Sequence, residues 1–412
     1  MDLRIMPGKL SGSVTPPPSK SMAHRLIIAA ALSGGISTIR NVALSKDIGA
    51  TLRCMRVMGT GVEQLDAHTL RIHGSGHSVP QAGIPGGLPH FDCGESGSTL
   101  RFLIPVALAV TGGGVFTGQS RLMERPLQPY FDLFAEKGIS YTRDGNTLTI
   151  QGRLTSGEYH LPGNVSSQFF TGLLFALPLL EGESTVTSTT PLESRNYVDM
   201  TLEALETFGI RVERQSSTVF RIPGGQRYLA QDAAPESDWS QAAFWYAANF
   251  LDNPVDVQGM NAYSTQGDMI VSKYYWLLAR PGETVDIDLS NCPDLLPPLA
   301  VMAAVRKGTT RFVNAARLRI KESDRLAAVY QMLTALGGQA EEGADNLTVH
   351  GVSTLQGGTV DGCNDHRIVM AAAIAATACQ TPVTILHAEA VAKSYPDFFE
   401  IYCSLGGEAY VL

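Results

Sequence analysis

The apolar residues of this chain gather into six short blocks rich in small and aliphatic side chains. Each block follows a polar loop and leads through a turn to a strand-like segment. A block that is apolar on all sides predicts a buried helix, and alternation of apolar and polar residues predicts a strand. We therefore expect buried helices over 26–32, 102–110, 169–180, 242–250, 295–305 and 368–378. Strands are expected after them over 36–40, 115–116, 184–187, 255–257, 309–313 and 383–386.

Amphipathic segments lie between these blocks. Residues 47–58 and 197–208 predict helices with one polar face, and residues 147–150 and 346–349 predict short strands. The unit recurs at about seventy residues, which exceeds solenoid periods and indicates whole folding units. Six units divide into two lobes of three. If the buried helices of a lobe bundle together, their positive N-termini point one way, and two facing lobes form a cleft lined by helix starts.

Composition narrows the class of protein. A chain of 412 residues predicts two or three domains, and 44% apolar with 17% charged residues is typical of a well-packed globular protein. The net charge of -8 argues against nucleic acid or an anionic membrane as a partner. No apolar stretch is long enough to cross a bilayer, and the first residues do not resemble a signal peptide. The six scattered cysteines predict reduced thiols, a cytoplasmic location and no metal site.

The segment from Pro16 to Arg25 is the clearest candidate for chemistry. Prolines hold an extended approach, Ser19 can cap a helix, and Lys20 and Ser21 then occupy its first turn. The N–H groups and dipole at a helix start favour anions, and Arg25 can lean toward the same opening. A Ser-Lys-Ser cap alone is ordinary. Its significance comes from similar polar loops before the other buried helices.

Several motifs occur together and in order along the chain. They are Ser19-Lys20-Ser21 with Arg25, Gly97 with Arg101, Glu124-Arg125-Pro126, Ser166-Ser167-Gln168, Pro293-Asp294, the segment 319–325, Asn364-Asp365-His366-Arg367 and Lys393-Ser394-Tyr395-Pro396. On these residues the chain resembles the 5-enolpyruvylshikimate-3-phosphate synthases, a family of enolpyruvyl transferases. The resemblance extends from Pro7 to the C-terminus.

The resemblance implies an α/β fold of two lobes, each built from three βαβαββ units, with the active site in the interlobe cleft. It implies that the chain crosses between lobes twice, near 15–18 and near 228–236. The first lobe would comprise residues 1–18 and 231–412, and the second residues 19–230. Neither crossing is a glycine-serine linker, so we expect a paired hinge that closes the site.

The resemblance also implies two sets of substrate-binding residues. Those expected to hold phosphoenolpyruvate are Lys20, Gly97, Arg125, Gln168, Arg325, Arg367 and Lys393. Those expected to hold shikimate 3-phosphate are Lys20, Ser21, Arg25, Ser166, Ser167, Gln168, Ser194, Tyr197, Asp294 and Lys321. Both substrates are multiply anionic, and Arg and Lys supply the charges that gather them. Small hydroxyl groups at a helix start suit a phosphate group.

The implied reaction transfers the enolpyruvyl group to the 5-hydroxyl of shikimate 3-phosphate by addition and elimination, in the shikimate pathway to chorismate and aromatic amino acids. It requires an acid and a base. The candidates are Asp294, Glu322 and Lys20, and their individual roles stay open at this stage. His366 beside Arg367 is expected to donate a hydrogen bond or to pack. No metal or organic cofactor is expected, and the resemblance implies a monomer.

Three positions depart from the family pattern. Glu95 stands in the Gly97 loop where many members have Asn, and Arg317 stands where Asn often binds the phosphate of shikimate 3-phosphate. Lys46 interrupts a common acidic pair and leaves Asp47. We therefore assign no substrate contact to Glu95 or Arg317.

Two alternative functions have distinct sequence signatures. A UDP-N-acetylglucosamine enolpyruvyl transferase would show Lys-Asn in place of Lys20-Ser21 and a cysteine before Arg125, and residues 118–125 contain no cysteine. A non-catalytic phosphosugar-binding protein could lose the acid–base pair, whereas Asp294 and Glu322 are both present. Nucleotide-binding loops of the GxxxxGK[ST] or GxGxxG type are absent from the sequence.

Overall fold

The computed structural model describes residues 1–76 and 87–412. The contacts among them divide the chain into two compact units. Unit 1 comprises Met1–Pro17 and Ser237–Leu412, and unit 2 comprises Pro18–Glu236. Unit 1 is thus built from both ends of the chain. Residues 231–236, which the sequence analysis assigns to the first lobe, contact unit 2, where Ala233 pairs with Ile39.

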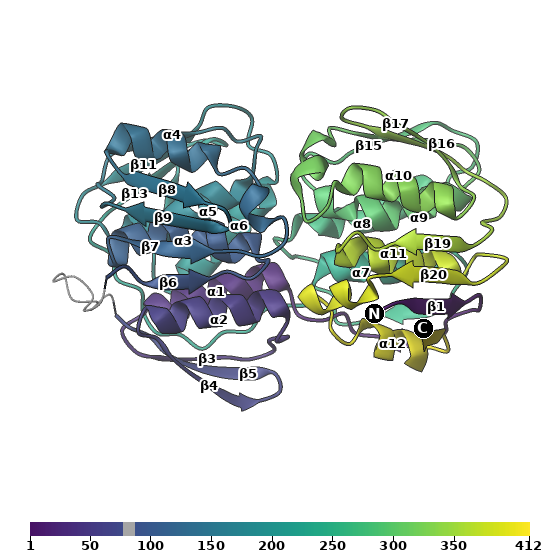
Figure 1. Cartoon of the computed structure of the whole chain (residues 1–412), viewed down its shortest axis with the longest axis horizontal. Coiled ribbons are helices and arrows are strands. Elements are labelled where there is room, and N and C mark those ends of the chain that lie inside the picture. Colours follow the sequence, from purple (N-terminus) through teal and green to yellow (C-terminus); the bar gives the residue numbers. More distant parts are fainter. Residues whose placement is uncertain (77–86) are drawn as a thin grey trace. The chain divides into compact units, whose positions relative to one another are not determined.

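Buried helices alternate with half-exposed ones along the described part of unit 2, and Figure 1 shows their arrangement. The helices described there are α1 (Lys20–Leu32), α2 (Lys46–Val57), α3 (Gly97–Val110), α4 (Gln128–Lys137), α5 (Ser167–Ala176) and α6 (Arg195–Thr207), with 3-10 turns η1 (Leu122–Glu124) and η2 (Leu177–Leu179). Helix α1 is buried from Met22 to Leu32: it is apolar on all sides from Leu26 onward, and the buried His24 and Arg25 side chains make hydrogen bonds. Helices α2, α4 and α6 keep polar residues on their outer faces.

The strands of unit 2 form small sheets. They are β3 (Ile36–Ile39), β4 (Gly61–Asp66), β5 (Thr69–His73), β6 (His90–Asp92), β7 (Gly113–Thr117), β8 (Ser140–Asp144), β9 (Thr147–Gln151), β10 (Glu158–Leu161), β11 (Ser184–Ser188), β12 (Glu213–Arg214) and β13 (Val219–Ile222). Two sheets share one order, β6-β7-β9-β8 and β10-β11-β13-β12. Their first two strands are parallel and are joined through a buried helix, and the others pair antiparallel. The third sheet has the order β3-β5-β4.

Unit 1 repeats this arrangement. Its described helices are α7 (Trp239–Phe250), α8 (Val271–Leu278), α9 (Leu296–Val305), α10 (Arg325–Ala335), α11 (His366–Ala376) and α12 (Phe398–Ser404), with 3-10 turns η3 (Gly267–Ile270), η4 (Pro293–Leu295), η5 (Ala316–Ile320) and η6 (Ala388–Lys393). Its described strands are β1 (Leu3–Met6), β2 (Gly12–Val14), β14 (Val255–Val257), β15 (Val285–Asp288), β16 (Thr309–Val313), β17 (Gln339–Glu342), β18 (Leu347–His350), β19 (Gly358–Asp361), β20 (Val383–Leu386) and β21 (Glu408–Val411).

The N-terminal strand belongs to the last sheet of unit 1. The order of that sheet is β19-β20-β1-β21, and β1 pairs antiparallel with both neighbours (Figure 1). Leu3 lies opposite Ile385 on one side and Val411 on the other. The sheet β15-β16-β18-β17 has the same order as those of unit 2, whereas β14 and β2 form a two-stranded parallel sheet. The first strands of the chain therefore complete unit 1.

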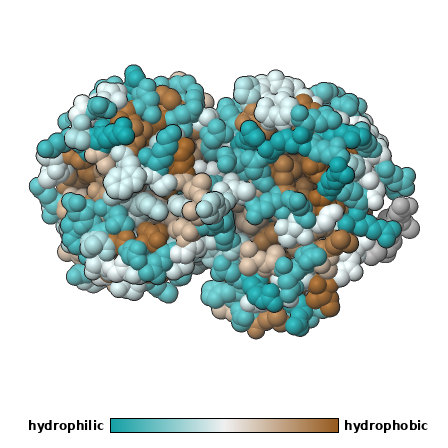
Figure 2. Space-filling model, turned by 180° about the vertical axis from the view of Figure 1, so that it is seen from behind, coloured by the Kyte–Doolittle hydropathy of each residue, from teal (hydrophilic) through white to brown (hydrophobic). Residues whose placement is uncertain are grey.

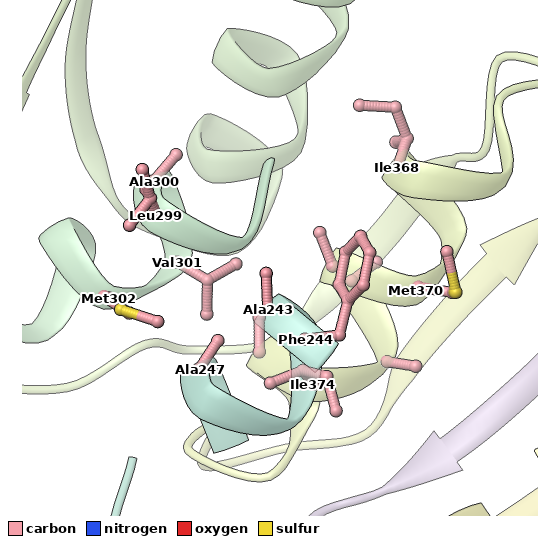
Figure 3. Close-up of a cluster of buried hydrophobic side chains, with 14 of the residues drawn as sticks. Ala243, Phe244, Ala247, Leu299, Ala300, Val301, Met302, Ile368, Met370 and Ile374 are labelled. Carbon is pink, nitrogen blue, oxygen red and sulfur yellow. The ribbon is translucent and has the colours of Figure 1, made fainter. Parts of the chain in front are cut away.

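The core of unit 1 lies where α7, α9 and α11 pack together. Figure 3 shows Ala243, Phe244 and Ala247 of α7 beside side chains of α9 and α11. Every residue from Leu296 to Ala304 is buried, so α9 meets apolar neighbours on all sides. Alanine is frequent in these helices, and its small side chain lets their backbones approach closely.

The predicted secondary structure agrees with these elements, apart from their ends. The expected helix over 169–180 stops at Ala176 and continues as the 3-10 turn η2. Pro178 explains this change because it lacks the N–H that an α-helix needs at that position. The serine predicted to cap the first helix does so: the Ser19 hydroxyl accepts a hydrogen bond from the Met22 N–H.

The surface is mixed in polarity. Figure 2 shows one face of the molecule, on which hydrophobic residues are scattered among hydrophilic ones. No helix in residues 1–76 and 87–412 combines the length and hydropathy needed to cross a membrane.

Candidate functional site

The first turn of α1 presents Lys20. Its Nζ donates to Asp47 Oδ2 at 2.8 Å, near the start of α2, and the two side chains are 15% and 12% exposed. The cap on Ser19 begins α1 immediately before Lys20, which holds the ammonium group at a helix N-terminus. Ser21 follows, and its carbonyl accepts from Arg25 Nη1 at 2.6 Å.

Gly97 is the first residue of α3 and lies against Arg125. A Cβ at position 97 would be 2.5 Å from Arg125 Nη1 and 2.9 Å from its Cζ. The glycine therefore leaves the space that the guanidinium occupies. Arg125 follows η1, and its Nε is buried with no hydrogen-bond partner among the described residues. The Ser96 hydroxyl caps α3 by accepting from the Thr99 N–H at 3.2 Å.

Gln168 joins the starts of α3 and α5. Its Oε1 accepts from Arg101 Nη1 at 2.8 Å, and its Nε2 donates to Ser98 Oγ at 3.1 Å. Arg101 is buried and lies over the Phe169 ring. Ser166 caps α5 through the Gln168 N–H. These contacts fix the Gln168 amide, while Ser167 is a buried residue in the same first turn.

Arg25 lies deeper than the sequence analysis expects. It is 2% exposed and extends from α1 into the core of unit 2. Its Nη2 donates to the Tyr197 carbonyl at 2.8 Å, and its Nε donates to Thr201 Oγ1 at 2.9 Å. Burial lowers its pKa to about 10. Ser194 precedes α6 and has a left-handed backbone conformation. Because Tyr197 is in the first turn of α6, the bond from Arg25 to its carbonyl joins that turn to α1.

Arg325 is the centre of the second cluster, which lies in unit 1. Its side chain is 1% exposed, and all three guanidinium nitrogens contact carboxylates. Nη1 meets Asp294 at 2.7 Å, Nη2 meets Glu322 at 2.6 Å, and Nε meets Asp365 at 2.9 Å. Burial alone would lower the pKa of Arg325, but the three carboxylates raise it. The guanidinium is therefore charged and fixes both predicted catalytic carboxylates, Asp294 and Glu322.

Asp294 is surrounded by cations. Besides Arg325, it accepts from Arg367 Nη2 at 2.9 Å, and Lys321 Nζ lies 3.6 Å from its Oδ1. Burial opposes ionisation of Asp294, yet Arg367, Lys321 and Arg325 outweigh burial and hold its pKa well below the ordinary value. Asp294 is thus an anion with both oxygens engaged, and its side chain remains 16% exposed.

Burial also changes the pKa of Lys321. It lowers the pKa of the Lys321 ammonium to about 8, although Asp294 opposes the change. Lys393, at the end of η6, donates to the Asn364 carbonyl at 2.6 Å. His366 and Arg367 form the first turn of α11, and both are buried. The structure thus joins five of the residues predicted in unit 1, Asp294, Lys321, Glu322, Arg325 and Arg367, by ion pairs, and Lys393 contacts the carbonyl of Asn364, which precedes Asp365.

Two buried acids were not among the predicted residues. Asp365 caps α11 and accepts from Arg325, from Ser323 Oγ and from the Arg367 N–H. Its place before a predicted helix could have revealed the cap. Asp268 accepts a short hydrogen bond from Ser240, and burial followed by the charge of Asp294 raises its pKa to about 7. Nothing in its sequence neighbourhood indicates that placement.

Two of the positions that depart from the family pattern can be placed in the structure. Arg317 donates to the Ser290 carbonyl at 2.6 Å, which fixes η5 against the loop before η4. Glu95 is half-buried between Gly94 and Ser96. Within the described residues, no group of three or more His, Cys, Asp or Glu is arranged to hold a metal ion.

Two α/β units, with cations, hydroxyl groups and carboxylates at the starts of their buried helices, are the arrangement that the resemblance to the enolpyruvyl transferases implies. The model of the EPSP synthase (3-phosphoshikimate 1-carboxyvinyltransferase) family matches residues 5–402, and the chain belongs to this family. It is 44% identical to 3-phosphoshikimate 1-carboxyvinyltransferase of Clostridium kluyveri, over 98% of this chain and 97% of that protein. The protein of that name from Clostridium acetobutylicum is also 44% identical, over 99% and 98%.

Solved structures agree with this assignment. The EPSP synthase of Acinetobacter baumannii superposes with a TM-score of 0.79 and 25% sequence identity, and the match covers 100% of both chains. The fold class predicted from the sequence is therefore confirmed.

Proposed function

We propose that the residues described above carry out the reaction of this family by addition and elimination. The chain transfers the enolpyruvyl group of phosphoenolpyruvate to shikimate 3-phosphate, a step of the shikimate pathway to aromatic amino acids. The accepting group is the 5-hydroxyl, and phosphate leaves. The observation that carries the mechanism is the placement of Asp294, held by Arg325 on one oxygen and Arg367 on the other.

The residues proposed for phosphoenolpyruvate are chiefly cations, which suit its negative charges. Arg125 supports this proposal because its guanidinium lies against the start of α3, where Gly97 leaves it room. Arg groups suit carboxylate and phosphate because they bind two oxygens at once. The proposed residues are Lys20, Gly97, Arg125 and Gln168 in unit 2, and Arg325, Arg367 and Lys393 in unit 1. Arg325 contributes by orienting Asp294 and Glu322, since its three nitrogens are already engaged.

The shikimate 3-phosphate site uses hydroxyl groups at the starts of α5 and α6. N–H groups of a first turn, with serine hydroxyls beside them, suit phosphate oxygens. Arg25 supports the site from within the core by holding the carbonyls of Ser21 and Tyr197. The proposed residues are Lys20, Ser21, Arg25, Ser166, Ser167, Gln168, Ser194 and Tyr197 in unit 2, and Asp294 and Lys321 in unit 1.

Asp294 is the proposed partner of the reacting hydroxyl. Its low pKa keeps it ionised, so it can accept the hydroxyl hydrogen as the oxygen attacks C2 of phosphoenolpyruvate. The methylene carbon gains a proton in the addition step and loses one when phosphate departs. Glu322 and Lys20 are proposed to exchange these protons with the methylene carbon and the leaving phosphate. This division follows from the residue types, because a carboxyl and an ammonium can both give and take protons.

Phosphate release tests the proposed function. The purified chain is mixed with phosphoenolpyruvate and either shikimate 3-phosphate, UDP-N-acetylglucosamine or no acceptor. We expect release only with shikimate 3-phosphate. Release only with the nucleotide sugar would assign the chain to the cell-wall enzymes instead. Tight binding of shikimate 3-phosphate without release would indicate a binding protein.

We further propose that the protein is a cytoplasmic monomer. All six cysteines are free thiols, and disulfides are rare in reducing compartments, which supports this location. Light scattering of the purified protein tests the monomer, and fractionation of the producing cells tests the location. A dimeric mass would contradict the proposed monomer. Recovery of the protein outside the cytoplasm would contradict the proposed location.

A further inference from the structure

Helices α1 and α2 are joined by two polar contacts one turn apart. Lys20 Nζ meets Asp47 Oδ2 at 2.8 Å, and His24 Nδ1 meets Thr51 Oγ1 at 2.8 Å. On α1, His24 lies four residues after Lys20, and on α2, Thr51 lies four residues after Asp47. Residues four apart share one face of a helix, so both contacts lie between the same two helix faces. The outer contact holds a residue of the proposed substrate sites. The inner contact is fully buried, since His24 and Thr51 are both 0% exposed.

The inner contact continues to α3. Thr51 Oγ1 lies 2.7 Å from Thr99 Oγ1, and the Thr99 hydroxyl donates to Ser96 Oγ at 2.7 Å. Ser96 caps α3 and immediately precedes Gly97. Thr99 and Ser96 are as buried as the first pair. An unbroken series of hydrogen bonds, His24–Thr51–Thr99–Ser96, therefore connects the second turn of α1 to the first turn of α3.

The direction of these hydrogen bonds determines the form of His24. A hydroxyl group has one hydrogen to donate. Because Thr99 donates to Ser96, it accepts from Thr51, and Thr51 in turn accepts from His24 Nδ1. His24 is then a neutral imidazole with its hydrogen on Nδ1. Its Nε2 is buried without a partner among the described residues, and a second proton there would find no acceptor. Burial, with Lys20 and Arg25 nearby, lowers the pKa of His24 well below its ordinary value.

We propose that His24, Thr51 and Thr99 are positioning residues that set the start of α3 relative to Lys20. These hydrogen bonds hold the Ser96 cap in place, and the cap positions the next two residues, Gly97 and Ser98. Gly97 makes room for Arg125, and Ser98 accepts from Gln168. The inference rests on the proposed function, in which these groups bind phosphoenolpyruvate. A buried polar chain of this kind specifies geometry because each of its members has few alternative partners.

Removal of the Thr99 hydroxyl separates this role from general stability. Thr99→Val cuts the link to α3 and leaves both contacts between α1 and α2. We expect KM for phosphoenolpyruvate to rise about 10-fold, the effect of roughly one lost hydrogen bond. KM for shikimate 3-phosphate should rise less, because Gly97 and Arg125 belong only to the phosphoenolpyruvate set whereas Gln168 belongs to both sets. Thr99→Ser restores the hydroxyl and should restore KM.

Thr310→Val is the matched control. Thr310 is also 0% exposed, and its hydroxyl accepts from Arg306 in unit 1, away from the proposed residues. Both KM values should stay at the wild-type level in this variant. Equal effects of Thr99→Val and Thr310→Val would overturn the positioning role. So would a parallel rise of both KM values in Thr99→Val together with a lowered melting temperature.

Nitrogen NMR of His24 provides a readout that needs no substrate. In protein labelled with 15N at its nine histidines, the His24 signal is identified by its loss in His24→Asn. We expect a protonated Nδ1 and an unprotonated Nε2. The reverse tautomer would overturn the proposed direction of the chain. His24→Asn places an amide nitrogen near the position of Nδ1 and should retain KM, whereas His24→Leu should raise it.

The two failures are distinguishable. If the wild-type chain released phosphate only with a different acceptor, the function proposed above would fail. The tautomer of His24 and the contrast between Thr99→Val and Thr99→Ser in phosphoenolpyruvate kinetics would still decide the positioning role.

Discussion

The guanidinium of Arg125 occupies the space where Gly97 would otherwise carry a side chain. A Cβ at position 97 would lie 2.5 Å from Nη1, closer than any real contact of that kind. The obstructing atom is the end of a flexible side chain. A larger residue at position 97 would therefore displace Arg125 and leave the backbone in place.

Gly97→Ala should consequently weaken phosphoenolpyruvate binding more than it weakens folding. Losing one charge-assisted contact of Arg125 is worth about 1.5–3 kcal/mol, or roughly a 10- to 100-fold rise in KM for phosphoenolpyruvate. Steady-state kinetics with each substrate varied in turn measures this effect. Gly8→Ala is the control, because a Cβ there meets nothing within 4 Å. An unchanged KM in Gly97→Ala would refute the placement of Arg125 in the site.

Asp294→Asn tests the proposed base. The change preserves the shape of the side chain but removes the negative charge that Arg325, Arg367 and Lys321 surround. Turnover should fall about 10²- to 10⁴-fold, the usual size of an acid–base contribution. The turnover of Glu322→Gln should decrease by a factor in the same range. If both variants kept nearly normal turnover, these carboxylates would not be the acid and base. Asp286→Asn, at an exposed pair with Arg311, is the control.

Arg325→Lys tests the centre of the unit 1 cluster. A lysine cannot reach three carboxylates at once, so at least one buried charge would lose its partner. Breaking a buried ion pair costs about 3–5 kcal/mol, which should appear as a lower denaturant midpoint. Arg311→Lys removes a similar bidentate contact with Asp286 from the exposed surface and should leave the midpoint near that of the wild type. Equal midpoints for the two variants would contradict the proposed importance of burial.

Asp268 should make stability depend on pH. Burial and the charge of Asp294 raise its pKa from 3.8 to about 7. Between these values the folded chain holds a proton that the unfolded chain has released. Stability contributed by this group is therefore present at low pH and is lost as the pH rises through about 7. Urea unfolding of wild type and Asp268→Asn from pH 4.5 to 8 measures the difference.

The stability difference between Asp268→Asn and wild type should change with pH in one direction. Relative to wild type, Asp268→Asn should gain stability as the pH increases, because the amide carries no charge to bury. Asp256 is exposed, so Asp256→Asn removes no buried carboxyl group. Its free energy of unfolding should follow the same dependence on pH as that of wild type. A constant difference between wild type and Asp268→Asn across the range would show that Asp268 does not retain its proton.

The sequence by itself determined the repeating helices and strands and the motifs at the helix starts. Apolar blocks such as 295–305 have no polar face, which predicts burial, and α9 is buried from Leu296 to Ala304. Caps are equally local: a serine before an apolar block, such as Ser19, satisfies the N–H groups of the next turn. Local signals of this kind need no knowledge of distant residues.

The tertiary structure alone decided which charges meet. Arg25 and Arg325 are both arginines near a helix start, yet Arg25 contacts neutral oxygens and Arg325 contacts three carboxylates. Asp268 and Asp294 are both acids in unit 1, yet burial and then the charge of Asp294 raise the pKa of Asp268, whereas nearby cations overcome burial and lower the pKa of Asp294. These differences depend on contacts between residues tens of positions apart in the chain. Charge interactions act through space, so distance and burial decide the chemistry of residues that look alike in the sequence.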